Sequence, residues 1–241
     1  KEKQRKTRVR SIQSNRLTSP PKVSPSTAKT TKTSQPSVQP SKETKPTNPP
    51  SQLDRILDGI QTFYREAKDL KADFKQTYTY VKVGRKKRSS GRVFFKTPHR
   101  MRWDYKSPNS KLFVSDGQTL WVYEPSKKQA FKRNLKRSQL PVAMTFMSGQ
   151  GDLRREFNAK LMPEADDLYR VDLVLKKDEG DYKAIRLSVR KTDFSVVTST
   201  VVDPVGNLNE IRFSQVKTNT NVPDRAFKFV SPKGVRVISD F

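Results

Sequence analysis

The stretch that most constrains the fold is residues 91–123, GRVFFKTPHRMRWDYKSPNSKLFVSDGQTLWVY, because apolar and polar residues alternate through it in short runs. Alternation with a period of two predicts strands with one apolar face. The runs are interrupted at residues 97–99, 106–109 and 115–117, where proline, glycine, asparagine and serine favour turns. We therefore predict four short antiparallel strands with one broad aromatic face. The aromatic residues of the stretch are Phe94, Phe95, Trp103, Tyr105, Phe113, Trp121 and Tyr123.

Strand parity groups five side chains of this stretch, three of them aromatic, into a candidate apolar cavity. Met101, Trp103 and Tyr105 share one face of a strand, and Val93 and Phe95 share one face of the strand before it. A cavity wall and an ordinary core have the same sequence pattern. The residues alone therefore leave both interpretations open.

The flanking segments predict one long helix and more strands. Residues 53–70 place apolar side chains three and four apart after Ser51, a residue suited to the N-cap, and predict an amphipathic helix. Residues 72–83 predict a strand and residues 84–90, GRKKRSS, a basic hairpin loop. Further strands are expected at residues 128–132, 169–177, 183–191, 195–203 and 208–217, with apolar residues at 227–237 closing the chain. About ten strands with two or three helices indicate a single antiparallel sheet or barrel.

A second helical pattern lies in residues 140–148. Leu140, Ala143, Met144 and Met147 fall on one stripe, and Gly149 and Gly151 end it. Such a segment fits an ordinary core helix. It equally fits a movable lid, because methionine side chains repack easily.

Residues 1–52 form a separate region, with twelve basic residues, two acidic residues, eight prolines and no aromatic residue. This composition buries too little apolar area to offset the entropy of ordering, so we expect a disordered tail. Its cluster KEKQRKTRVR fits an electrostatic contact with anionic envelope surfaces, and it also fits a solvated linker. Because the chain begins at Lys1, we expect a processed chain from which a signal peptide was removed.

Composition argues against catalysis. The chain has no cysteine and a single histidine, His99, beside a proline in an expected turn. Asp116, Asp203 and Asp224 also lie at expected turns, where aspartate caps backbone amides. No run approaches the roughly 20 apolar residues of a membrane-spanning helix. We predict no enzyme activity, no metal site and no cofactor.

Four strings in order give the chain a family resemblance. They are KTPHRMRWDY at residues 96–105, VSDGQTLWVYEPSKKQA at 114–130, LP…MSG at 140–149 and FKFVSPKGV at 227–235. Over residues 53–241 the chain resembles LolA, the family of periplasmic outer-membrane lipoprotein carriers. The resemblance implies a mainly β, α+β fold. It is an incomplete antiparallel barrel, or half-barrel, covered by an N-terminal helix and a short helical lid.

The resemblance also implies a function. A family member binds the acyl chains of lipoproteins in an apolar cavity and carries them through the periplasm from the inner to the outer membrane, as a monomer. It implies an inner-membrane ABC transporter as donor and, in some lineages, an outer-membrane receptor. It places the side of Met101 and Trp103 inward. Some members carry an arginine that bonds to the lid where this chain has Thr97.

Two other classes of function remain open. The first is a related half-barrel sensor or receptor that binds a lipid to signal. The second is nucleic-acid binding, because the formal net charge is +26 and strand aromatics can stack bases. Against the second, basic residues are spread along most strands instead of clustering beside the aromatics.

Overall fold

The computed structural model describes residues 49–135, 151–165, 167–176 and 182–240. The chain divides into two units, Lys1–Thr47 and Asn48–Phe241, and all described residues lie in the second. The predicted lid at residues 140–148, with Leu140, Ala143, Met144 and Met147, lies outside the described residues, as does nearly all of the predicted tail. Both stay predictions.

The described part of the chain begins with helix α1, Gln52–Glu66. Its start is fixed by a capping box, in which the Ser51 hydroxyl accepts from the Asp54 N–H and the Asp54 carboxylate accepts from the Ser51 N–H. The predicted end at residue 70 is wrong. Ala67 is already extended, and Leu70 pairs with Phe95 and Thr218 in the sheet. The apolar residues at 67 and 70 fit the helical spacing, but Ala67 ends the helix as its C-cap and Leu70 belongs to β1.

Twelve strands form one sheet, in the order β12-β6-β5-β4-β3-β2-β1-β11-β10-β9-β8-β7. The first six strands along the chain are β1 (Asp69–Tyr80), β2 (Arg85–Lys96), β3 (Arg100–Ser107), β4 (Lys111–Ser115), β5 (Thr119–Glu124) and β6 (Gln129–Asn134). The other six are β7 (Phe157–Ala165), β8 (Leu168–Leu175), β9 (Ala184–Arg190), β10 (Val196–Val202), β11 (Leu208–Thr218) and β12 (Arg236–Asp240). The short helical elements are η1 (Val81–Val83), η2 (Pro125–Lys127), α3 (Leu153–Glu156) and η4 (Asp224–Phe227).

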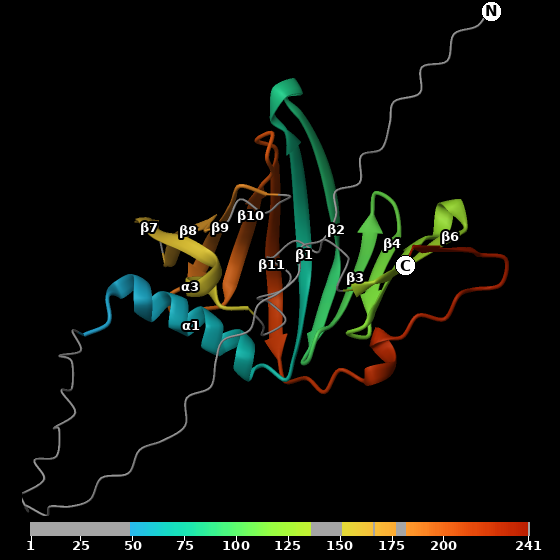
Figure 1. Ribbon diagram of the computed structural model, residues 1–241, viewed down its shortest axis with the longest axis horizontal. Coiled ribbons are helices and arrows are strands. Elements are labelled where there is room, and N and C mark those ends of the chain that lie inside the picture. The colour runs from blue at the N-terminus through green and yellow to red at the C-terminus, as the bar shows by residue number, and fades with distance from the viewer. Residues whose placement is uncertain (1–48, 136–150, 166, 177–181, 241) are drawn as a thin grey trace, which may run out of the picture. The chain divides into compact units, whose positions relative to one another are not determined.

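The sheet is antiparallel except between β12 and β6, and its end strands β12 and β7 do not meet (Figure 1). The result is an open half-barrel, which confirms the predicted fold class. The four strands expected in residues 91–123 are β2 to β5, with turns where the sequence predicted them.

The structure corrects the strand prediction at two places. Residues 84–90 are not a loop, because the β1–β2 ladder continues to the pair Tyr80–Arg85 and leaves only Val81–Gly84 to turn the chain. Basic side chains are compatible with this ladder, since successive residues point to opposite faces. Strand β7 has no counterpart in the prediction. Its Pro163 weakens the strand pattern, and a proline is tolerated here because β7 is an edge strand.

Helix α1 packs on the face of the sheet that we call the inner face, the one carrying Phe74, Val93 and Trp103. The Tyr64 hydroxyl accepts from the Val196 N–H at 3.1 Å, which ties α1 to β10. About one turn earlier in α1, the Gln61 side chain accepts from the N–H of Leu153 at 2.6 Å, and α3 lies beside α1 (Figure 1). The core therefore lies between α1 and the inner face. Its largest fully buried side chains include Phe74, Trp103, Phe157, Ile56, Ile60, Leu173 and Ile185.

Candidate functional site

The structure brings all five predicted cavity residues together on the inner face of β2 and β3. Val93 pairs with Trp103 and Phe95 pairs with Met101 across the ladder, and Tyr105 lies opposite Gly91. Val93, Phe95, Met101 and Trp103 are buried, and Tyr105 is partly buried. Their shared face agrees with the parity argument. Their role in binding stays a prediction.

Trp103 is the centre of an aromatic cluster. Its ring centroid lies 4.9 Å from that of Phe74, 6.0 Å from that of Phe95 and 6.2 Å from that of Phe213. The ring of Tyr105 also packs edge-on against Phe74, at 4.9 Å. These rings come from β1, β2, β3 and β11, which are neighbours in the sheet. The cluster is thus built by strand order as well as by alternation.

Gly91 leaves room for this packing. A Cβ atom at this position would lie 2.0 Å from the Asp104 carbonyl oxygen and 3.0 Å from the Phe74 ring. Neither neighbour can withdraw freely, since one is backbone and the other is core. Glycine in a strand interior often marks such a close approach.

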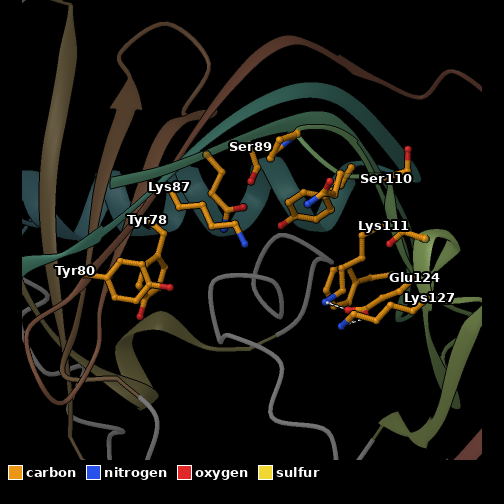
Figure 2. A pocket seen from close by; sticks show the side chains of 14 residues that line it. Tyr78, Tyr80, Lys87, Ser89, Ser110, Lys111, Glu124 and Lys127 are labelled. Atoms are coloured by element: carbon orange, nitrogen blue, oxygen red, sulfur yellow. Dashed lines mark ion pairs between the residues drawn. The ribbon is translucent and has the colours of Figure 1, made fainter. Parts of the chain in front are cut away.

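Beyond Tyr105 the same face opens into a pocket of about 390 Å³. It lies at the end of the sheet where β1 and β2 join, and side chains from β1 to β5 line it (Figure 2). Its aromatic lining residues are Tyr78, Tyr80, Tyr105 and Phe113, and its charged ones are Lys87, Lys111, Glu124 and Lys127. The volume falls within the range of about 300–1,000 Å³ typical of ligand pockets.

Charged groups line one side of the pocket. Glu124 Oε1 lies 2.9 Å from Lys111 Nζ, and Glu124 Oε2 lies 2.7 Å from Lys127 Nζ. Hydrogen bonds from Lys127 and Lys111 lower the pKa of Glu124, so the group is a carboxylate at neutral pH. The ammonium of Lys111 also lies 4.9 Å from the centre of the Phe113 ring. Two ion pairs that share Glu124 therefore fix the side chains on this side of the pocket.

Two tyrosines of the pocket, Tyr78 and Tyr105, remain neutral. Burial raises the pKa of Tyr105 to about 12. Burial first, and then the hydrogen bond to Asp203, raises the pKa of Tyr78, whose hydroxyl donates to Asp203 Oδ2 at 3.0 Å. These phenols therefore offer a ligand an apolar ring and a neutral hydroxyl.

Sequence reasoning missed several pocket residues. Gln76, Tyr78 and Tyr80 share the phase of Phe74 along β1, so parity places them on the same face. Phe113 pairs with Trp103 and therefore follows the same rule. The alternation is present in these strands as well, but the cavity prediction was limited to residues 93–105.

Turn residues behave largely as predicted. Asp116 accepts from the N–H groups of Gln118 and Thr119, and Asp203 accepts from those of Val205 and Asn207. The capping role predicted for Asp224 is wrong, because its carboxylate instead forms ion pairs.

The Asp224 carboxylate pairs with Lys96 and Arg100, at the two ends of the β2–β3 turn. In the same turn, the Thr97 hydroxyl donates to the carbonyls of Ala67 and Lys68, at 3.2 and 3.0 Å. At the position where some members of the resembled family carry a lid-bonding arginine, Thr97 thus fastens the turn to the end of α1.

Two kinds of feature are absent from the described residues. No three histidine, aspartate or glutamate side chains gather there as a metal site would require. No helix in that part of the chain has the length and apolarity to cross a membrane.

Comparison with known proteins identifies the family. The sequence model "Outer membrane lipoprotein carrier protein LolA" matches residues 65–230. The chain is 30% identical over 190 residues to an outer-membrane lipoprotein carrier protein of Chromobacterium violaceum, covering 79% of this chain and 90% of the relative. It is 27% identical over 184 residues to the protein of that name from Dechloromonas aromatica, covering 76% and 88%.

A solved structure has the same fold. It is a conserved protein from Thermus thermophilus that is described as uncharacterized. It is 14% identical, with a TM-score of 0.52 over 77% of this chain and 98% of that one. The match to the family covers more than half of the chain, and the half-barrel agrees with it. The chain therefore belongs to the LolA family of outer membrane lipoprotein carrier proteins.

Proposed function

We propose that this chain is a periplasmic carrier that binds the acyl chains of lipoproteins on the inner face of its half-barrel and moves them from the inner to the outer membrane. The observation that carries the proposal is the continuity between the open pocket and the aromatic cluster. Tyr105 lines the pocket, and its ring packs on Phe74, which packs on Trp103. An acyl chain entering at the pocket therefore contacts Tyr105 first, and the rings of Phe74 and Trp103 lie directly behind it.

The energetics of transport favour such a site. A chain of about 15 methylenes costs on the order of 12 kcal/mol to expose to water, at about 0.8 kcal/mol per methylene. Crossing an aqueous compartment therefore requires an apolar cavity that travels with the cargo. No acid, base or metal is needed for this task.

Trp103 adds a polar feature to the apolar wall. Its Nε1 atom is buried and has no hydrogen-bond partner among the described residues. A buried donor left unpaired costs free energy, and indole N–H groups in protein interiors usually find an acceptor. An ester or amide carbonyl of a lipoprotein anchor is such an acceptor. Under this proposal the packed cluster opens as cargo enters, so that the carbonyl accepts a hydrogen bond from Trp103 while the acyl chain contacts the neighbouring rings.

The partners follow from the same role. We propose an inner-membrane ABC transporter of the lipoprotein-release type as donor and an outer-membrane receptor as acceptor, with the carrier acting as a monomer after removal of a signal peptide. The sensor alternative has no specific observation in its favour. Nucleic-acid binding is disfavoured because the basic residues are spread along most strands instead of clustering beside the aromatics.

Photocrosslinking tests the site at two aromatic side chains that line the pocket. Tyr105 and Phe113 are each replaced by a photoreactive phenylalanine analogue, and the protein is incubated with a triacylated lipoprotein. We expect crosslinks to the acyl chains at both positions. The matched control is Phe94, which lies on the opposite face of β2 from Phe95 and should give none.

A substitution at Met101 then tests the buried part of the predicted cavity. Met101→Glu places a charge in a buried apolar site, where it is costly, and should abolish lipoprotein binding. Circular dichroism checks that the variant is folded. Equal crosslinking at Tyr105 and Phe94, or normal binding by folded Met101→Glu, would contradict the proposal.

A further inference from the structure

The β1–β2 hairpin ends in an exposed apolar tip. Val83 is 73% exposed and Val81 is 51% exposed, on either side of Lys82 in η1. Of the seven large apolar side chains that are exposed in the described residues, four lie at this end of the sheet: Tyr80, Val81, Val83 and Val205. Val205 belongs to the neighbouring β10–β11 turn, whose Asn207 side chain accepts from the Val81 N–H at 3.1 Å. The exposed apolar groups are therefore gathered and not scattered.

Cations surround this tip. Between Tyr80 and Arg88 the chain carries five basic residues and no acidic one. These are Lys82, Arg85, Lys86, Lys87 and Arg88, and all five are exposed. In the described part of the chain none of the five forms an ion pair, whereas Arg92 further along β2 pairs with Asp73. The tip thus presents unneutralised positive charge beside exposed valines.

We propose that this hairpin docks the protein on an anionic lipid bilayer, with Val81 and Val83 entering the interface and the basic residues contacting lipid phosphates. Charge complementarity favours a bilayer over an apolar protein groove, because an acyl region lies directly beneath a plane of negative charge. Long basic side chains can keep their charges at the headgroups while their stems lie along apolar surface. Polybasic segments gain binding free energy for every residue near such a surface.

Docking would bring the site to the membrane. Tyr78, Tyr80 and Lys87 belong to the same hairpin and line the inner-face pocket (Figure 2). Figure 1 shows this hairpin at one extremity of the sheet, beyond the ends of its neighbours. This consequence rests on the proposed function, because only a carrier has a lipid cargo to exchange at the membrane. The docking of the hairpin on the bilayer does not depend on the proposed function.

A fluorescent label reports insertion directly. The chain has no cysteine, so Val83→Cys in the full chain carries a single environment-sensitive fluorophore. The probe membranes are vesicles of equal parts phosphatidylcholine and phosphatidylglycerol, compared with vesicles of phosphatidylcholine alone. We expect a blue shift with the anionic vesicles only. The control is Val230→Cys, an equally apolar exposed site next to Phe229, whose ring packs on Trp121 of β5; its label should stay in water.

A charge-matched pair tests the cations. Lys82→Glu with Lys86→Glu should weaken binding to the anionic vesicles by about tenfold or more, given the contribution of each basic residue near a charged surface. Lys228→Glu with Lys233→Glu changes the net charge by the same amount at exposed lysines near Val230 and should have a much smaller effect. Co-sedimentation measures the affinities.

The outcomes separate this proposal from the carrier function. Weakened vesicle binding with unchanged acyl-chain binding in solution supports hairpin docking. A label at residue 83 that stays in water overturns it. Equal losses of vesicle affinity in the two double variants also overturn it, because the attraction would then depend on the total charge of the protein. Loss of acyl-chain binding by Met101→Glu with intact docking concerns the cavity alone.

Discussion

The inner face has two regions that share strands but differ in burial. Around Phe74, Val93 and Trp103 the face is packed and sealed. Around Tyr78, Tyr80 and Lys111 the same strands, on the same side, line an open pocket. Tyr105 stands between them, lining the pocket while its ring packs against the sealed cluster.

The difference shows that alternation and burial have separate causes. Alternation decides which side of the sheet a residue faces. Burial is decided by what lies above it, and α1 is fastened near β7, β10 and the start of β1. The inner face of β1 also becomes more polar toward the hairpin, because Gln76 is the next inward-facing residue after Phe74.

The largest expected effect comes from truncating one ring in each region. Trp103→Ala removes a fully buried ring and should lower the free energy of unfolding by about 3–5 kcal/mol. Tyr80→Ala removes a ring that is 39% exposed in the open region and should cost about 1 kcal/mol or less. Urea unfolding measures both. Similar costs would mean that the two regions are not energetically distinct.

A smaller effect is expected where α1 approaches the sheet. A Cβ at Gly59 would lie 2.4 Å from Cγ of Phe194, the atom at the base of that ring. Gly59→Ala should therefore destabilise the protein by about 1–3 kcal/mol through overpacking, although alanine raises helix propensity. Arg55→Ala, on the exposed side of the same helix, is the matched control and should stay within about 0.5 kcal/mol. A stabilised Gly59→Ala would show that α1 has room to move away.

The smallest effect concerns the ion pairs of the open region. Lys127 and Lys111 lower the pKa of Glu124, so the stabilisation from its charge is present above the unfolded-state pKa and is lost as pH falls through the lower folded-state pKa. Glu124→Gln should cost at most about 1 kcal/mol at neutral pH, because these lysines are partly solvated.

The cost should disappear in acid, which urea unfolding at pH 7 and at a pH of about 2 would measure. Glu66→Gln, which makes the same exchange at an exposed carboxylate at the end of α1, is the control measured beside it. A cost that stays constant with pH would mean that the amide disturbs packing and that charge is not the cause.

The sequence alone determined the faces of the strands. Period-two alternation placed Val93 and Phe95 on one face of their strand and Met101, Trp103 and Tyr105 on one face of theirs, and the register joins the two groups on the inner face. Ser51 and the helical spacing located the start of α1. These features are local, because each depends on residues only a few positions apart in the sequence.

Only the tertiary structure decided which part of that face is core and which is pocket. Trp103 is surrounded by rings from β1, β2 and β11, and β11 lies more than a hundred residues along the chain. The edge strand β7 and the parallel pairing of β12 with β6 also depend on strand order, which no local pattern encodes. Burial depends on contacts between distant segments, whereas alternation depends on backbone geometry, and for this reason Trp103 and Tyr78 look alike in sequence and differ in the fold.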